Sequence, residues 1–248
     1  MSPTIEVLYA DDHVVVANKP SGMLVHRGWA QDKRTAMDEV RDAVGQRVHP
    51  LHRLDRGTSG ALLFALDADV ARDLAGAFER GEVGKRYVAL VRGHLRRTGR
   101  LEHPVPSRER GPRVPAATSL RPIASSPHAR CSLVEAQPHT GRLHQIRRHL
   151  KHLSHPIVGD VRYGDGRVNR HFREHHGLTR LALHAFALAF RHPQRGWLTV
   201  YAPLPPDLRM AWQALGVAPT DLESRANQPW TDDTPIATPD PPTPRCPP

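Results

Sequence analysis

The sequence predicts an α+β protein with a mixed, largely antiparallel central sheet and flanking helices. Short apolar runs that fit strands recur along the chain. Amphipathic segments of helical period lie between some of them. The two kinds of segment do not follow the regular strand–helix–strand repeat of a parallel α/β protein. With 248 residues, 39% of them hydrophobic, the chain is long enough to bury a substantial core.

The first part of the chain predicts a hairpin, a helix and a buried strand. Residues 5–10 and 14–20 have strand character and are separated by a short polar turn, as in a pair of hairpin strands. Residues 35–46 place apolar side chains at helical spacing behind a candidate cap, Thr35. The apolar run at 61–67 has the length of a short buried strand.

The middle of the chain is less regular. Residues 69–78 resume the helical period, and residues 86–93 alternate as a strand, with Tyr87 on one face. Residues 94–128 are rich in arginine, proline and serine and show little periodicity. We expect them to form an extended basic insertion, with or without short strands.

The last part predicts a strand at 131–138, a basic amphipathic helix at 141–153, a strand pair at 181–190 and 197–203, and a closing helix at 206–216. These elements complete one expected domain, and their mixed order again favours the α+β class.

Two regions differ in charge. Residues 216–248 hold nine of the 24 prolines, have no apolar period and carry a charge of −3. We expect this segment to be a disordered tail, the alternative being a partner-binding segment. Residues 1–215 form the predicted domain. They carry a charge of +13, because the whole chain carries +10 and residues 216–248 carry −3. Arginine far outnumbers lysine, which suits bidentate contact with phosphate, although a high-GC genome also enriches arginine.

The composition limits where the protein works. Cys131 and Cys246 are far apart and form neither a disulfide framework nor a CxxC metal motif, which fits a reducing cytoplasm. No signal-peptide pattern and no apolar run of membrane-spanning length occurs. We expect a soluble, cytoplasmic monomer that does not contact membranes.

The segment HRLDRGTSG, residues 52–60, places one carboxylate, Asp55, between Arg53 and Arg56. In an extended chain Arg53 and Asp55 share one face while Leu54 points to the core. The following Gly-Thr-Ser-Gly turn offers hydroxyls and backbone donors that favour an ionised carboxylate. Such a group is a candidate nucleophile or base. A surface ion pair in front of a strand is the alternative.

A second basic segment, residues 139–153, surrounds an apolar helical stripe with polar and cationic side chains. A solvated basic face is one interpretation, and a cation beside the stripe, such as Arg147, that reaches a cleft and pairs with Asp55 is the other. The side chains concerned are Arg142, His144, Gln145, Arg147, Arg148 and Lys151.

Other chemistries lack their sequence supports. His149, His152 and His155 lie three residues apart, so on a helix the third ring points away from the first, and no Cys or HExxH partner is present. We therefore expect no metal. Dinucleotide, P-loop and serine-hydrolase motifs are absent as well. Tyr87 is a candidate cleft residue, or a half-buried strand tyrosine.

Taken together, the motifs resemble those of the RluA-type pseudouridine synthases over roughly residues 5–205. The ordered set is specific, because HRLDRGTSG occurs in order with several other blocks. These blocks are NKPSGMLVH (18–26), HRLDRGTSG (52–60), GKRYVALVRG (84–93), TGRLHQIRRHL (140–150), HPIVGD (155–160) and LALHA (181–185).

The resemblance implies isomerisation of uridine to pseudouridine in RNA by the pseudouridine synthase catalytic fold, without cofactor or metal. Asp55 matches the aspartate that attacks the target nucleotide, at the base or at the ribose. Tyr87 matches the tyrosine that packs on the uracil and assists proton removal from C5. Arg147 matches the arginine that pairs with the aspartate, and Arg53 the residue that enters the RNA where the base leaves. Further RNA contacts are expected from His52, Arg56, Arg142, His144, Arg148 and Lys151.

Within the family, three segments resemble the bacterial tRNA pseudouridine synthase C group, which modifies uridine 65 of certain tRNAs. They are HRGW (26–29), VRDAVGQ (40–46) and residues 164–185. We expect the catalytic domain to begin at the first residues, without the S4-like module of many ribosomal RNA relatives. A relative acting on ribosomal RNA or on another tRNA position remains an alternative, as does a non-catalytic RNA-binding protein.

Overall fold

The computed structural model describes residues 5–27, 34–216 and 235–236. The helices are α1 (Ala36–Val44), α2 (Ala68–Glu79), α3 (Gln145–His152), α4 (Gly166–His176) and α5 (Pro206–Ala214). The strands of the main sheet are β1 (Glu6–Ala10), β2 (Val14–Lys19), β3 (His49–Pro50), β4 (Ser59–Ala65), β5 (Gly84–Arg92), β6 (Gly99–Glu102), β9 (Ala117–Ser125), β10 (Cys131–Pro138), β11 (Leu183–His192) and β12 (Gly196–Tyr201). A separate small hairpin consists of β7 (Val105–Pro106) and β8 (Arg113–Val114).

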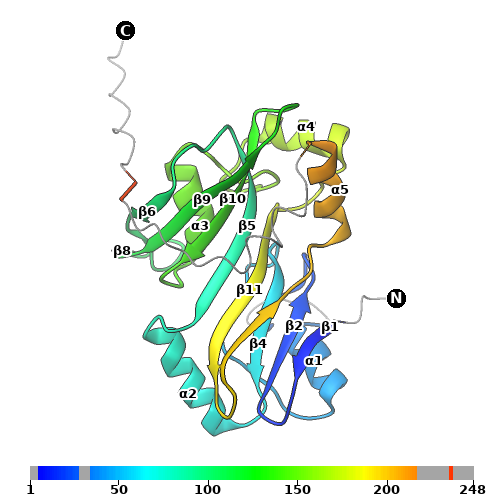
Figure 1. Ribbon diagram of the computed structural model, residues 1–248, viewed down its shortest axis with the longest axis vertical. Coiled ribbons are helices and arrows are strands. Elements are labelled where there is room, and N and C mark those ends of the chain that lie inside the picture. Colours follow the sequence, from blue (N-terminus) through cyan, green and yellow to red (C-terminus); the bar gives the residue numbers. More distant parts are fainter. Residues whose placement is uncertain (1–4, 28–33, 217–234, 237–248) are drawn as a thin grey trace.

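The main sheet has ten strands in the order β1-β2-β4-β11-β5-β10-β9-β6, with β12 paired to β11 and β3 paired to β4. Among the described strands, the β11–β4 pairing is parallel and the other pairings are antiparallel. The predicted α+β class with a mixed, largely antiparallel sheet is confirmed. Figure 1 shows α1 and α2 beside the end of the sheet that carries β2 and β4, and α3, α4 and α5 at the other end.

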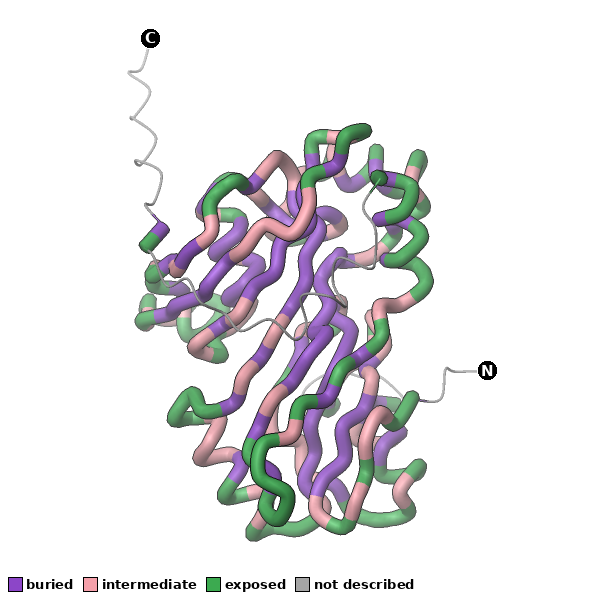
Figure 2. Tube along the Cα trace, in the orientation of Figure 1, coloured by how far each residue is buried: buried purple, intermediate pink, exposed green. Residues whose placement is uncertain are grey.

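Both faces of the sheet are covered. Along β2 the valines and alanine alternate between two apolar clusters, with Val15 and Ala17 in one and Val14 and Val16 in the other. Every residue of β4 is buried, as expected for a strand with a packed layer on each side. Figure 2 shows buried strands through the middle of the molecule and exposed positions at the turns and helices around it.

Local signals place the N-terminal elements as predicted. The 5–10 and 14–20 segments form the antiparallel pair β1–β2. Helix α1 begins after Thr35, whose hydroxyl accepts from the Asp38 N–H at 3.3 Å, while the Asp38 carboxylate accepts from the Thr35 N–H at 3.1 Å. This reciprocal capping box confirms Thr35 as the cap.

The basic helix is shorter than predicted. Helix α3 begins at Gln145, and the preceding residue, His144, adopts the left-handed backbone conformation with φ 52°. The buried Gln145 amide donates to the Ala117 carbonyl and the Thr118 hydroxyl, both at 2.9 Å. The same amide accepts from the Arg142 N–H, so residues 140–144 are held as a turn against β9.

Part of the expected basic insertion belongs to the main sheet, which corrects the prediction for residues 94–128. Strand β9 pairs with β10 over most of its length, and β6 pairs with β9. Arg121 and Pro122 interrupt the apolar pattern of β9. Glu135 on β10 accepts from Arg121 at 2.5 and 3.2 Å, so the buried sheet tolerates this arginine. The residue pattern also did not predict α4.

Most of the predicted tail lies outside the described residues. Of residues 217–248 the structure describes Pro235 and Ile236, which lie against β6, where the Ile236 N–H donates to the Arg100 carbonyl at 2.9 Å. Ile236 is 7% exposed. None of the described helices is both long and apolar enough to cross a membrane.

Candidate active site

The segment between β3 and β4 carries the predicted aspartate into a cleft. Leu54 is 5% exposed and belongs to the apolar core, and it also borders the cleft that Arg53 and Asp55 line. The Asp55 carbonyl accepts from the Thr58 N–H at 3.0 Å, which closes the turn that leads into β4. Gly60 then has φ +116° and lies so close to Ala185 on β11 that a Cβ there would meet the Ala185 backbone. The expected alternation and the turn are therefore both present.

Arg147 joins two carboxylates. Its Nη1 donates to Asp55 Oδ2 at 2.9 Å, and its Nε and Nη2 donate to the two Asp160 oxygens at 2.7 and 2.9 Å. The fork-to-carboxylate geometry with Asp160 fixes the guanidinium plane, so the remaining nitrogen is aimed at Asp55. Burial alone would lower the pKa of Arg147, but the hydrogen bonds and charges of both carboxylates raise it. Arg147 is a permanent cation beside Asp55.

Asp160 is itself held from several directions. It is 1% exposed, and its Oδ1 also accepts from the backbone N–H groups of Arg162 and Tyr163 at 2.9 and 3.0 Å. Burial pushes the pKa of this carboxyl up, but the hydrogen bond from Arg147 and the two backbone donors hold it below its usual value. Asp160 is the last residue of the HPIVGD block, but no local pattern predicted a role for it.

His144 and Tyr163 form a second contact between the same elements. His144 Nδ1 lies 2.9 Å from the Tyr163 hydroxyl, and its Nε2 lies 3.8 Å from Asp55 Oδ1. The Arg147 guanidinium lies over the Tyr163 ring, 5.0 Å from its centroid. Burial lowers the pKa of His144, although the Asp55 charge opposes this. A neutral imidazole therefore borders Asp55. Tyr163 gave no signal in the sequence, because only the loop after Asp160 brings it here.

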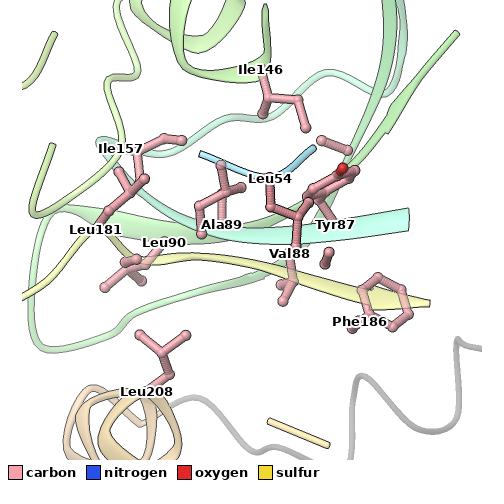
Figure 3. Packing of buried hydrophobic residues seen from close by; sticks show 14 of the residues in the cluster. Leu54, Tyr87, Val88, Ala89, Leu90, Ile146, Ile157, Leu181, Phe186 and Leu208 are labelled. Atoms are coloured by element: carbon pink, nitrogen blue, oxygen red, sulfur yellow. The ribbon is translucent and has the colours of Figure 1, made fainter. Parts of the chain in front are cut away.

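Tyr87 lies on β5 and borders the cleft. Figure 3 shows its ring near Leu54, with Ile146 from α3 close by, and the ring is 8% exposed. Its partners on both neighbouring strands are alanines, Ala185 and Ala136, so the ring has small neighbours beside it. Burial, together with the charge of Asp55, raises the pKa of Tyr87, so the phenol stays protonated at neutral pH.

The cleft has a volume of about 610 Å³, large enough for one nucleotide. Its wall comes from the 51–58 segment, β5, the β7–β8 hairpin and the turn before α3. Cationic side chains on this wall include Arg53, Lys85, Arg108, Arg142 and Arg147. Asp55 is thus a carboxylate within a mainly cationic cleft. Among the described residues no group of three or more side chains has the arrangement of a metal site.

The remaining residues predicted to contact RNA fall into three places. Arg53, Arg142 and His144 line the cleft, and Arg148 and Lys151 follow along α3. His52 also lines the cleft, but its Nε2 accepts from the Leu63 N–H at 3.1 Å and its ring stacks on Phe78. Burial and the nearby Lys85 lower its pKa to about 3.

Arg56 lies apart from the cleft wall. Its Nε donates to the Gly22 carbonyl at 2.9 Å, and its carbonyl accepts from the Gly22 N–H at 2.7 Å. These bonds join the HRLDR segment to the turn after β2. Nearby, the buried Lys19 donates to the carbonyls of Met23 and Arg56 at 2.7 and 3.3 Å.

Comparison with known proteins shows the family to which the chain is similar. The family model described as RNA pseudouridylate synthase matches residues 13–152. The tRNA pseudouridine synthase C of Pasteurella multocida (strain Pm70) is 45% identical over 212 residues, which cover 77% of this chain and 87% of the relative. The protein of the same name from Salmonella typhimurium (strain LT2) is 44% identical over 213 residues, 77% of this chain and 82% of the relative.

Solved structures share the fold as well. The human RNA Pseudouridylate Synthase Domain Containing 1 superposes with a TM-score of 0.70 at 27% identity, covering 85% of this chain and 90% of that chain. The human RNA Pseudouridylate Synthase Domain Containing 4 gives 0.69 at 25% identity, with 85% and 93% covered. From the matched family model and the identity of these relatives over most of their length, the chain belongs to the RNA pseudouridylate synthase family.

Proposed function

We propose that this enzyme converts uridine 65 of tRNA to pseudouridine and that Asp55 is the residue that attacks the target nucleotide. The observation that carries the proposal is the carboxylate of Asp55, held 2.9 Å from Arg147 at the wall of a cationic cleft of nucleotide size. The name shared by the bacterial relatives supports tRNA as the substrate. The sequence resemblance supports position 65.

The reaction is an isomerisation. The bond between N1 of uracil and C1′ of the ribose breaks, the base turns, and a bond from C5 to C1′ forms while C5 gives up its proton and N1 gains one. No atom enters or leaves overall, so the chemistry needs a nucleophile, a route for one proton and a water-poor pocket. Asp55 attacks at the base or at the ribose, as the resemblance implies. A carboxylate is a suitable nucleophile when a fixed cation stabilises it without protonating it.

Arg147 is the fixed cation that stabilises the Asp55 carboxylate. Because Asp160 fixes the guanidinium, Arg147 does not have to reorganise when charge on Asp55 changes during attack. Tyr87 packs against the uracil, as the resemblance implies, and its hydroxyl assists removal of the C5 proton as a hydrogen-bond partner and not as the base that takes the proton. Because the pKa of Tyr87 is raised, the uracil meets a neutral phenol. A neutral phenol does not repel the Asp55 carboxylate.

The target base has to leave its stack before it enters the cleft. This costs a few kcal/mol, which stacking on an aromatic ring and an inserted side chain offset. Arg53 is exposed and lines the cleft two residues before Asp55, a suitable place for insertion into the gap left by the base. Arg142 lies on the wall formed by the turn before α3, where it is available to phosphates.

Two alternatives predict different outcomes. A relative that modifies ribosomal RNA, or another tRNA position, would use the same cleft. A non-catalytic RNA-binding protein would bind RNA but leave uridine unchanged. The second alternative does not account for a carboxylate held in the cleft, since a carboxylate repels phosphate and a pure binder gains nothing from it.

The decisive experiment maps carbodiimide-marked pseudouridines in tRNA and ribosomal RNA from a strain that lacks the gene. We expect position 65 of tRNA to lose its mark and to regain it when the wild-type gene, but not an Asp55→Asn gene, is restored. Loss of a ribosomal mark, or of another tRNA mark, would replace the substrate assignment. An unchanged pattern would leave only the binding alternative.

The proposal also covers the compartment and the oligomeric state in which the enzyme acts. An enzyme of tRNA works in the cytoplasm, and we propose that residues 1–215 act there as a monomer. Light scattering of the purified protein tests this directly, because a mass of twice 27.7 kDa would contradict it.

A further inference from the structure

We propose that a second hollow, separate from the cleft, binds backbone phosphates of the same RNA at a distance from the target uridine. This inference rests on the proposed function, because it assumes that the enzyme's partner is an RNA longer than the target nucleotide. The hollow, here called the distal hollow, has a volume of about 960 Å³. It lies between the end of β5, the loop before β10, the end of α3 and the first turns of α4, the helix at the top of Figure 1.

The wall of the distal hollow is strongly basic. It carries four arginines and four histidines and no carboxylate: Arg92, Arg96, Arg130, Arg167, His94, His128, His155 and His171. One nearby acid, Asp165, lies 3.1 Å from Arg92 and also caps α4, so it is already engaged. Within the part of the chain that the structure describes, Arg96 and Arg130 make no ion pair with any carboxylate. Such a concentration of cations repels itself unless an anion binds.

The frame of the distal hollow is fixed by hydrogen bonds to backbone carbonyls. The Gly93 N–H donates to the Arg130 carbonyl at 2.7 Å, and His155 Nδ1 donates to the Arg92 carbonyl at 2.9 Å. The Ser132 hydroxyl donates to the Gly93 carbonyl at 3.0 Å. The segments that carry the cations are thus tied to one another, while Arg96 and Arg130 themselves are exposed. A preformed, basic frame with free cations suits an anionic ligand.

Helix α3 connects the two sites. His144 and Gln145, at its beginning, line the cleft, whereas Ser154 and His155, just after its end, line the distal hollow. At about 1.5 Å per residue, this separation is roughly 15 Å, less than the length of one RNA stem. Arg148 and the exposed Lys151 lie on α3 between the two sites. The basic surface therefore continues from the cleft to the distal hollow.

The chemistry of the wall selects phosphate rather than bases. Arginine and histidine supply donors for phosphate oxygens, and the described residues of the wall include no carboxylate or carboxamide side chain that would accept hydrogen bonds from base edges. The aromatic carbocycle in the wall, Phe172, is 3% exposed and belongs to the core. We therefore assign affinity, and no sequence preference, to the distal hollow.

The test compares two double variants of equal charge. Arg96→Gln/Arg130→Gln removes two cations of the distal hollow. Arg47→Gln/Arg209→Gln removes two exposed arginines that line neither site, and serves as the control. Binding is measured with the Asp55→Asn background and full-length tRNA, so that it does not depend on turnover. A trinucleotide centred on the target uridine, which is too short to reach from the cleft to the distal hollow, is measured in parallel.

We expect the distal double variant to weaken binding of full-length tRNA about ten-fold or more and to reduce the slope of log affinity against log salt by about two. Binding of the trinucleotide should change less than two-fold, and the control should resemble the parent for both RNAs. Equal effects of the two double variants, or equal losses for both RNAs, would overturn the distal hollow as a site. If the parent does not bind tRNA but binds ribosomal RNA, the substrate assignment fails, and the same comparison on ribosomal RNA still tests the distal hollow.

Discussion

The cleft and the distal hollow both collect arginines, but they treat the charge differently. In the cleft, Arg147 is bound to two carboxylates and is 8% exposed. In the distal hollow, Arg96 and Arg130 are exposed and make no ion pair within the described residues. A cation fixed between two carboxylates suits a reaction, because it does not have to reorganise when charge beside it changes. An open cation serves affinity, because it releases counterions when phosphate binds.

The largest effect that separates the two regions is expected from Asp55→Asn. The amide keeps the shape of the side chain but removes the proposed nucleophile, so turnover should fall by about 10⁴-fold or more. The affinity for tRNA should stay within a few-fold, because the cations of both regions remain. Release of tritium from tRNA labelled at C5 of uridine measures the first, and filter binding the second.

Asp69→Asn is a matched control for this change. Asp69 is an exposed residue of α2 that pairs with Arg72 within the same helix. This variant should retain parent activity. Near-parent turnover of Asp55→Asn would remove Asp55 from the chemistry, and with it the contrast between the two regions.

The next largest effect concerns the residue that fixes Arg147. In Asp160→Asn, Arg147 loses its bidentate partner and two backbone donors lose a charged acceptor. We expect kcat to fall about 100-fold with KM nearly unchanged, and the free energy of unfolding to fall by about 3 kcal/mol. Steady-state kinetics and urea unfolding measure the two effects separately.

Asp160→Glu provides a conservative comparison because it keeps the charge with a longer arm. Partial recovery of kcat would agree with a positioning role. If Asp160→Asn lowered stability but left kcat unchanged, Asp160 would support only the fold, and Asp55 would not depend on a fixed guanidinium.

The sequence predicted the parts of the site that depend on local pattern. Alternation predicted that Leu54 faces the core while Arg53 and Asp55 share the other face, and the helical stripe offered Arg147 as a partner for Asp55. The family resemblance decided against the alternatives, a surface ion pair and a solvated basic face. The pair between Asp55 and Arg147, 92 residues apart, was an expectation that the structure reproduces at 2.9 Å.

The contacts that the sequence missed depend on long-range packing. Asp160 and Tyr163 reach Arg147 through a loop whose path no local pattern specifies. Strand β9 was hidden because Arg121 breaks its apolar pattern, and the neutralising Glu135 lies on the next strand. His52 was predicted as an RNA contact from its motif, but its bond to the Leu63 N–H can be seen only in the folded chain.

The salt dependence of KM for tRNA tests the affinity role of the exposed cations. Because the distal hollow and the cleft wall present cations that phosphate can neutralise, KM for tRNA should rise steeply with salt. For four phosphate contacts, a change from 50 to 200 mM weakens binding roughly 80-fold. The turnover at saturating tRNA should change little, since the Asp55–Arg147–Asp160 contacts are internal and screened less. A flat KM would contradict the affinity role of the open cations.

The smallest effect on catalysis is expected from protonation of two buried histidines, which lowers the stability of the fold. His149, on the inner side of α3, lies 2.9 Å from the Thr118 hydroxyl and 2.8 Å from the His103 carbonyl, and burial lowers its pKa to about 4. Burial likewise lowers the pKa of His184 to about 4. The unfolded chain takes up a proton on each ring near pH 6.5. The folded chain does so only near pH 4.

Between these values the unfolded state binds more protons, so stability is highest above pH 6.5 and is lost as pH falls towards 4. From pH 7 to pH 5 we expect each ring to lower the free energy of unfolding by about 1–2 kcal/mol. Urea unfolding at the two pH values measures this loss. His149→Gln should lower stability at pH 7 but make the pH dependence shallower, whereas His175→Gln, on an exposed position of α4, should leave it unchanged. An equally steep pH dependence in His149→Gln would show that the helix joining the two regions is not anchored by a neutral histidine.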